Sequence, residues 1–142
     1  MVARAIMLTL TASELFIGVW ADVLPRSFHD QFPGGPFHWL PPLGPFNEHL
    51  TRDFGGLSLA LAAVTFIAVL RPIPLAAVTM AVAWELYSVP HLIFHLGHTA
   101  PFAIVDNVLT VASLSATVAL PLVAVGLVLA IRPEAGARSA PR

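Results

Sequence analysis

Three histidines lie close together in the segment PHLIFHLGH, within a chain that is mostly apolar. On a helix that advances by about 100° per residue, His91, His95 and His98 fall within about 60° of one another and share one face. Imidazole nitrogens bind zinc, copper or iron, and they also carry protons near neutral pH. The spacing therefore predicts a metal or proton site. The competing interpretation is that the rings only hydrogen-bond to a neighbouring loop or to lipid headgroups.

Other side chains could complete such a site. The chain has no cysteine, so a metal ion would need His, Asp or Glu ligands. We expect Asp53 and Asp106 near the same membrane surface as the three histidines, with His49 as a further ligand or a neighbour of the ligands. Arg52 is a candidate clamp for one of these aspartates or for an anionic ligand.

Two glutamates, Glu14 and Glu85, fall near the centres of long apolar segments. A carboxylate at the centre of a bilayer costs on the order of 2.5 to 3.5 kcal/mol, so each requires pairing or protonation. We expect both to face the bundle interior and to relay protons or ions. A structural hydrogen bond between helices is the alternative. Polar stripes that include Ser88 and Thr110 must face protein or water, and helix packing suffices to explain the Ser and Thr positions.

The composition indicates that this chain folds within a lipid bilayer. Of its 142 residues, 57% are hydrophobic and 11% are charged, the mean hydropathy is +0.82, and lysine is absent. A soluble domain of this size cannot bury so much apolar surface. The net charge of -1 and the absence of a basic run exclude nucleic acid as a partner.

Four apolar segments are long enough to span the membrane as helices, which takes about 20 residues each. The sequence thus predicts an all-α bundle of four transmembrane helices over residues 1–131, with helices at about 5–24, 52–70, 73–97 and 102–131. The connection 25–51, rich in proline and aromatic residues, should form an ordered, non-helical cap at the membrane interface. The alternative is an irregular surface loop held by a few aromatic anchors. Residues 132–142 should form a disordered cytoplasmic tail.

Arginine positions predict the orientation. With both termini in the cytoplasm, five arginines lie inside and only Arg26 and Arg52 lie outside. The cap is then extracytoplasmic, and His29, His38 and His49 lie on the same side as the histidines of PHLIFHLGH. The two groups of histidines can therefore meet.

The segments NEHLTRDFGG and VPHLIFHLGH, followed by a helix that opens with an aspartate, resemble a family of small four-helix integral membrane proteins of actinobacteria. In layout these proteins are loosely similar to DoxX-like proteins. The resemblance covers most of residues 1–131 and implies a multi-pass protein of the bacterial plasma membrane. It implies no activity and no catalytic residues.

Three functions remain open from the sequence. The first is an outer-side His/Asp cluster that binds zinc, copper or iron, or relays protons. The second is a small membrane enzyme, or a lipid- or quinone-binding protein, that uses the same His and Glu residues for acid–base chemistry. The third is an accessory subunit of a larger membrane complex or a homo-oligomer, with the polar stripes as contacts between subunits.

Overall fold

The computed structural model describes residues 1–130 and contains four long helices: α1 (Val2–Val23), α3 (Glu48–Leu70), α4 (Pro74–Gly97) and α5 (Ile104–Ala130). All four are long and apolar enough to cross a membrane. The protein is a multi-pass integral membrane protein, and the predicted all-α, four-helix fold is confirmed. The predicted tail at 132–142 lies outside the described residues.

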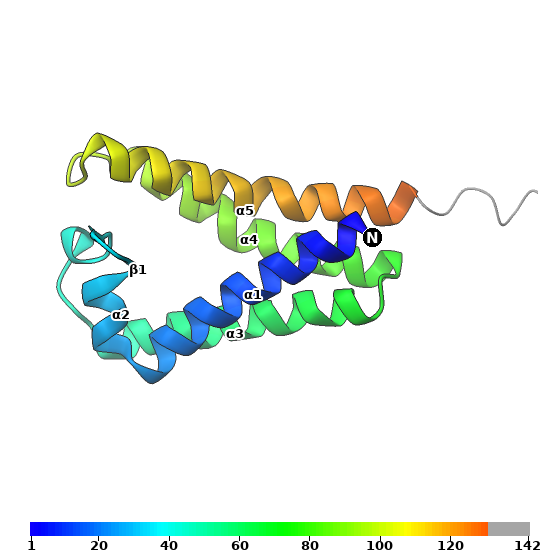
Figure 1. Cartoon of the computed structure of the whole chain (residues 1–142), viewed down its shortest axis with the longest axis horizontal. Helices are drawn as coiled ribbons and strands as arrows, with labels where there is room; N and C mark the ends of the chain where they lie inside the picture. The colour runs from blue at the N-terminus through cyan, green and yellow to red at the C-terminus, as the bar shows by residue number, and fades with distance from the viewer. Residues whose placement is uncertain (131–142) are drawn as a thin grey trace, which may run out of the picture.

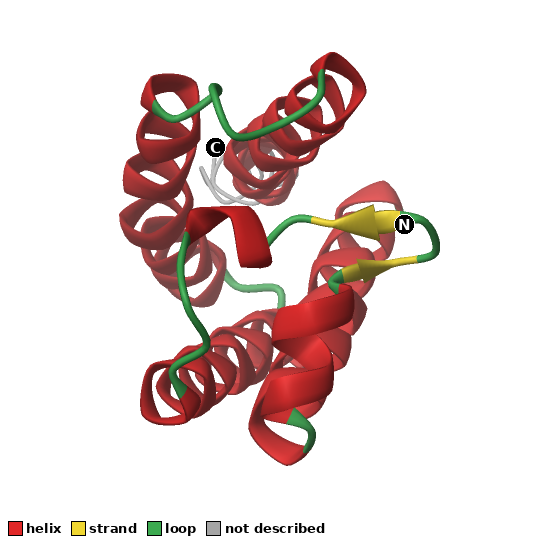
Figure 2. Ribbon diagram, turned by 90° about the vertical axis from the view of Figure 1, so that its left-hand side faces the viewer, coloured by secondary structure: helices red, strands yellow, loops and turns green. Residues whose placement is uncertain are grey.

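The four helices run antiparallel to their chain neighbours and pack as two close pairs, α1 with α3 and α4 with α5 (Figure 1). Viewed from the end that carries the α1–α3 connection, they surround a common axis, and this connection crosses over their ends (Figure 2). We call the connection, residues 24–47, the cap. Side chains that point inward from all four helices can therefore meet on the axis.

Glycine brings α1 and α3 together. A Cβ atom added to Gly55 would lie 2.7 Å from the backbone nitrogen of Asp22 and 3.0 Å from the carbonyl oxygen of Gly18. No larger residue fits there without separating the helices. Small residues at such crossings are the usual means of helix association in lipid, because close backbone approach maximises van der Waals contact.

Away from the cap, the bundle interior is apolar. Met7, Met80 and Trp84 are fully buried, within a continuous core to which all four long helices contribute. Within it, the indole N–H of Trp84 donates to the Thr65 hydroxyl at 2.9 Å. Thr65 in turn donates to the Leu61 carbonyl at 2.7 Å, so both buried polar groups are satisfied.

The cap has more regular structure than we expected. It contains a short helix α2 (Pro25–Gln31), a two-stranded hairpin of β1 (Pro33–Gly34) and β2 (Phe37–His38), and a 3-10 turn η1 (Pro41–Leu43). The expectation of a non-helical cap is wrong for α2. Its proline occupies the first helical turn, where no backbone N–H is needed, and the next proline comes only after the helix ends.

Aromatic side chains attach the cap to the bundle. Phe28 of α2 is buried and packs against Trp20 of α1 and Phe54 of α3, with ring centroids 5.6 and 5.8 Å away. At the entry to α3, the Asn47 side chain accepts a hydrogen bond from the Leu50 amide at 3.1 Å and caps the helix. The cap is therefore an ordered element, fixed at both of its ends.

Candidate functional site

Each of the four membrane-length helices contributes one buried polar residue to the candidate site. Glu14, Ser58, Ser88 and Thr110 are 3%, 1%, 0% and 6% exposed, respectively. Among the described residues, Glu14 Oε2, the two serine hydroxyls and the threonine hydroxyl all lack a hydrogen-bond partner. Because unpartnered polar atoms are costly in a bundle interior, four of them form a distinctive feature of this chain.

We call these four residues the polar layer. The Ser58 hydroxyl lies beside the Glu14 carboxyl. On α3, Ser58 lies between Phe54 and Thr65. The ring of Phe54 is 6.3 Å from that of Tyr87, and Thr65 accepts a hydrogen bond from Trp84. Ser58 therefore lies opposite the stretch of α4 that carries Ser88.

Thr110 lies in the same half of the bundle as Ser88. The ring of His95 lies 6.2 Å from that of Phe102, just before α5 begins. Ser88 lies seven residues before His95 on α4, about 10 Å along the helix axis, and Thr110 lies six residues after the first residue of α5, about 9 Å along it. The polar layer therefore lies within the spanning helices, in the half of the bundle next to the cap.

A line of titratable side chains leads from the polar layer toward the cap. Tyr87 lies close enough to Glu14 for the carboxylate charge to act on its phenol. The ring of Tyr87 is 5.4 Å from that of His91, which is 5.1 Å from the ring of His95. We call Tyr87, His91 and His95 the file. Successive members lie one helical turn apart on α4 and follow a single face.

On the side of the polar layer away from the cap, the bundle interior is apolar. From the polar layer toward the end opposite the cap, the interior consists of the apolar core around Met7, Met80 and Trp84. The buried groups at this end include no titratable side chain among residues 1–130. Chemically, the site is a carboxyl group beside a hydroxyl, with a line of titratable rings that extends from it toward the cap.

Several predicted ligands have contacts outside the file. His98 follows the end of α4, where its ring stacks on Phe94 at 4.0 Å and its Nδ1 donates to the Phe94 carbonyl. Asp106 accepts a hydrogen bond from the cap residue Trp39. His49 and Asp53 lie 3.5 Å apart, with side chains 88% and 63% exposed. Within residues 1–130, no three His, Asp or Glu side chains are placed to hold a metal ion.

Arg52 and Glu85, two further predicted site residues, belong to neither the polar layer nor the file. The Nε of Arg52 donates to Glu48 Oε1 at 2.9 Å, and its Nη2 forms an ion pair with the same oxygen at 2.9 Å. Its Nη1 donates to the Asp22 carbonyl near the end of α1. Arg52 thus joins α3 to α1. Glu85 is half-buried, with Oε1 buried and without a hydrogen-bond partner in the described chain. No described contact links Glu85 to the file.

Sequence reasoning missed three contributors. The sequence patterns did not single out Tyr87 or Ser58, and they did not predict the hydrogen bond between Trp39 and Asp106. A usable signal existed for Tyr87, since it precedes His91 by one turn on the same helix. Ser58 and Trp39 gave none, because their partners come from elements distant in sequence.

Comparison with known proteins finds no matching family model, no matching curated protein and no matching solved structure. The family resemblance noted from the sequence therefore gains no support beyond the architecture, which is that of a small four-helix membrane protein. The function has to be argued from the polar layer and the file.

Proposed function

We propose that this protein binds protons inside the membrane, at Glu14, and exchanges them with the cap side through Tyr87, His91 and His95. With the cap outside, as the arginine distribution favours, those protons come from the extracytoplasmic side. The observation that supports the proposal is the alignment of three rings that can carry protons, at centroid spacings of 5.4 and 5.1 Å, with a buried carboxyl group at the inner end of the line.

The chemistry of each group suits this role. A carboxyl group within a membrane-spanning helix is least costly when protonated, and its neighbour Ser58 can donate to it or accept from it. Phenol and imidazole groups pass protons by alternating between donor and acceptor roles. The apolar core on the far side leaves no matching route there, so we propose proton exchange with one side rather than conduction across the membrane.

A proton fits the site better than a metal ion. Two histidines one turn apart supply only two ligands, and Asp53, Asp106 and His98 have other contacts. Element analysis of the purified protein checks this preference. Stoichiometric zinc, copper or iron that is lost in both His91→Ala and His95→Ala would assign the two rings to a metal and replace the proton proposal.

Infrared difference spectroscopy tests proton binding at Glu14. For protein in vesicles, the spectrum is compared between about pH 4 and pH 9, a range that covers carboxyl and imidazole titration. We expect a carboxyl C=O band that is lost in Glu14→Gln and retained in Glu85→Gln, the matched control from α4. Identical difference spectra for the parent and Glu14→Gln would overturn the proposal.

A further inference from the structure

A groove runs along the outward-facing side of α1, next to the cap and apart from the proton site. It has a volume of about 650 Å³ and is lined by Ala12, Leu15, Phe16, Val19, Trp20, Val23 and Leu24. The single polar group of these side chains, the Trp20 indole N–H, donates to the Ser27 hydroxyl at 3.2 Å. Because α1 spans the membrane, this apolar groove faces acyl chains.

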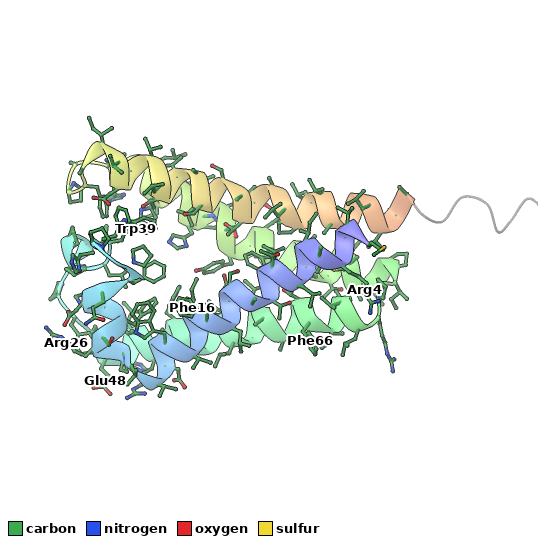
Figure 3. All side chains as sticks on the ribbon, in the orientation of Figure 1. Arg4, Phe16, Arg26, Trp39, Glu48 and Phe66 are labelled. Atoms are coloured by element: carbon green, nitrogen blue, oxygen red, sulfur yellow. The ribbon has the colours of Figure 1, made fainter. Side chains whose placement is uncertain are left out.

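The groove continues into a second hollow of about 420 Å³ where α1 ends. The two share Val23 and Leu24, and the second adds Pro25, Arg26, Ser27, Phe46 and Glu48. Arg26 and Glu48 lie at the end of the bundle where α1, α2 and α3 come together (Figure 3). The combined hollow is therefore apolar within the span and polar at headgroup depth.

Arg26 has guanidinium N–H donors that are not used by the described residues around it. Its Nε donates to Asp30 at 2.6 Å, its guanidinium carbon lies 5.2 Å from the centre of the Phe46 ring, and its side chain is 71% exposed. Neither Nη1 nor Nη2 has a partner among residues 1–130. The nearby Arg52 differs, because all three of its guanidinium nitrogens contact Glu48 or the Asp22 carbonyl.

We propose that this groove binds one phospholipid of the surrounding bilayer, with its phosphate on the free Nη groups of Arg26 and one acyl chain along α1. A guanidinium group presents paired N–H donors that match phosphate oxygens. From Ala12 to Val23 the groove covers about 16 Å of helix, roughly half of a hydrocarbon core of about 30 Å, which is the depth of one leaflet. The negative charges of Asp30 and Glu48 offset the positive charges of Arg26 and Arg52. The site therefore recognises the phosphate group itself rather than the net charge of the headgroup.

Quenching of Trp20 tests the proposal without reference to Glu14. Protein in dodecyl maltoside micelles is titrated with phosphatidylglycerol that carries brominated chains, or with diacylglycerol that carries the same chains. The Trp20→Phe variant identifies the share of fluorescence that comes from the groove. We expect phosphatidylglycerol to quench Trp20 saturably at a several-fold lower lipid-to-detergent ratio than diacylglycerol.

Two variants locate the phosphate. Arg26→Gln should remove the advantage of phosphatidylglycerol, whereas Arg71→Gln, at the opposite membrane surface, should keep it. Equal quenching by both lipids in the parent protein would overturn the proposal, as would an undiminished preference in Arg26→Gln. Efficient disulfide dimer formation through Val19→Cys that lipid does not suppress would also overturn it, because a second copy of the chain would then occupy the groove.

Discussion

Trp39 in the cap donates a hydrogen bond to Asp106 in the first turn of α5, with 3.1 Å between Nε1 and Oδ1. The two residues are 67 positions apart in the sequence, and their hydrogen bond links the cap to α5. In Figure 3, Trp39 points from the cap toward the α4–α5 pair. The bond holds the cap across the end of the bundle that the file approaches.

Removal of this bond should loosen the cap. We expect Trp39→Phe and Asp106→Ala to increase hydrogen–deuterium exchange in residues 32–46, and to lower stability by about 1 to 3 kcal/mol, as for a bond to a charged group. Asp106→Asn is the matched control, since its amide oxygen still accepts from the indole N–H. Faster exchange in Asp106→Asn than in Asp106→Ala would contradict the assignment.

The two adjacent glycines of α3 should respond in opposite ways to alanine. Gly55→Ala forces a methyl group against the backbone of α1 and should cost about 1 to 3 kcal/mol, because the helices must separate. Gly56 has nothing within 4 Å of an added Cβ, so Gly56→Ala should be neutral or stabilising by up to about 1 kcal/mol. Thermal unfolding in detergent compares the two, and equal effects would refute the close α1–α3 contact.

Acid should weaken the cap through Asp30. Hydrogen bonds from His29 and Arg26 hold the pKa of Asp30 below its ordinary value of 3.8. Its stabilising contribution is therefore fully present above the unfolded pKa and is lost as the pH falls through the lowered folded pKa. We expect tryptophan fluorescence to report cap loosening in this acidic range, with a smaller change in Asp30→Asn. Asp53→Asn should behave like the parent, and an unchanged acid transition in Asp30→Asn would disprove this role.

Orientation can be read by cysteine labelling, because the chain has no cysteine of its own. With the cap outside, Thr99→Cys should react with an impermeant thiol reagent in intact cells, and Pro72→Cys should react only after lysis. Both positions are exposed and lie at opposite ends of α4. The reverse pattern would place the file on the cytoplasmic side.

Local signals in the sequence were sufficient for the spanning helices and for parts of the candidate site. Runs of apolar residues define the four spans, since length and hydropathy alone decide whether a helix can cross lipid. The proximity of His91 and His95 follows from their four-residue spacing on one helix. The interior position of Glu14 follows from the cost of exposing a carboxylate to lipid.

Contacts between distant segments could not be derived in this way. The hydrogen bond from the indole N–H of Trp39 to the Asp106 carboxylate joins residues 67 positions apart, and no local pattern predicts it. Ser58 reaches Glu14 only because Gly18 and Gly55 let α1 and α3 approach closely. Such pairings depend on how helices cross, and a single sequence carries no direct record of that geometry.

The rate at which the Glu14 proton exchanges with solvent tests the central claim most directly. Protein in vesicles is transferred from H₂O to D₂O, and the shift of the Glu14 carboxyl band is followed in time by infrared spectroscopy. The account predicts exchange at least about tenfold slower in His91→Phe and in Tyr87→Phe, as is typical when a proton-transfer group is removed, and an unchanged rate in His49→Phe. Equal rates in the parent, His91→Phe and Tyr87→Phe would contradict it, because protons would then reach Glu14 without the file.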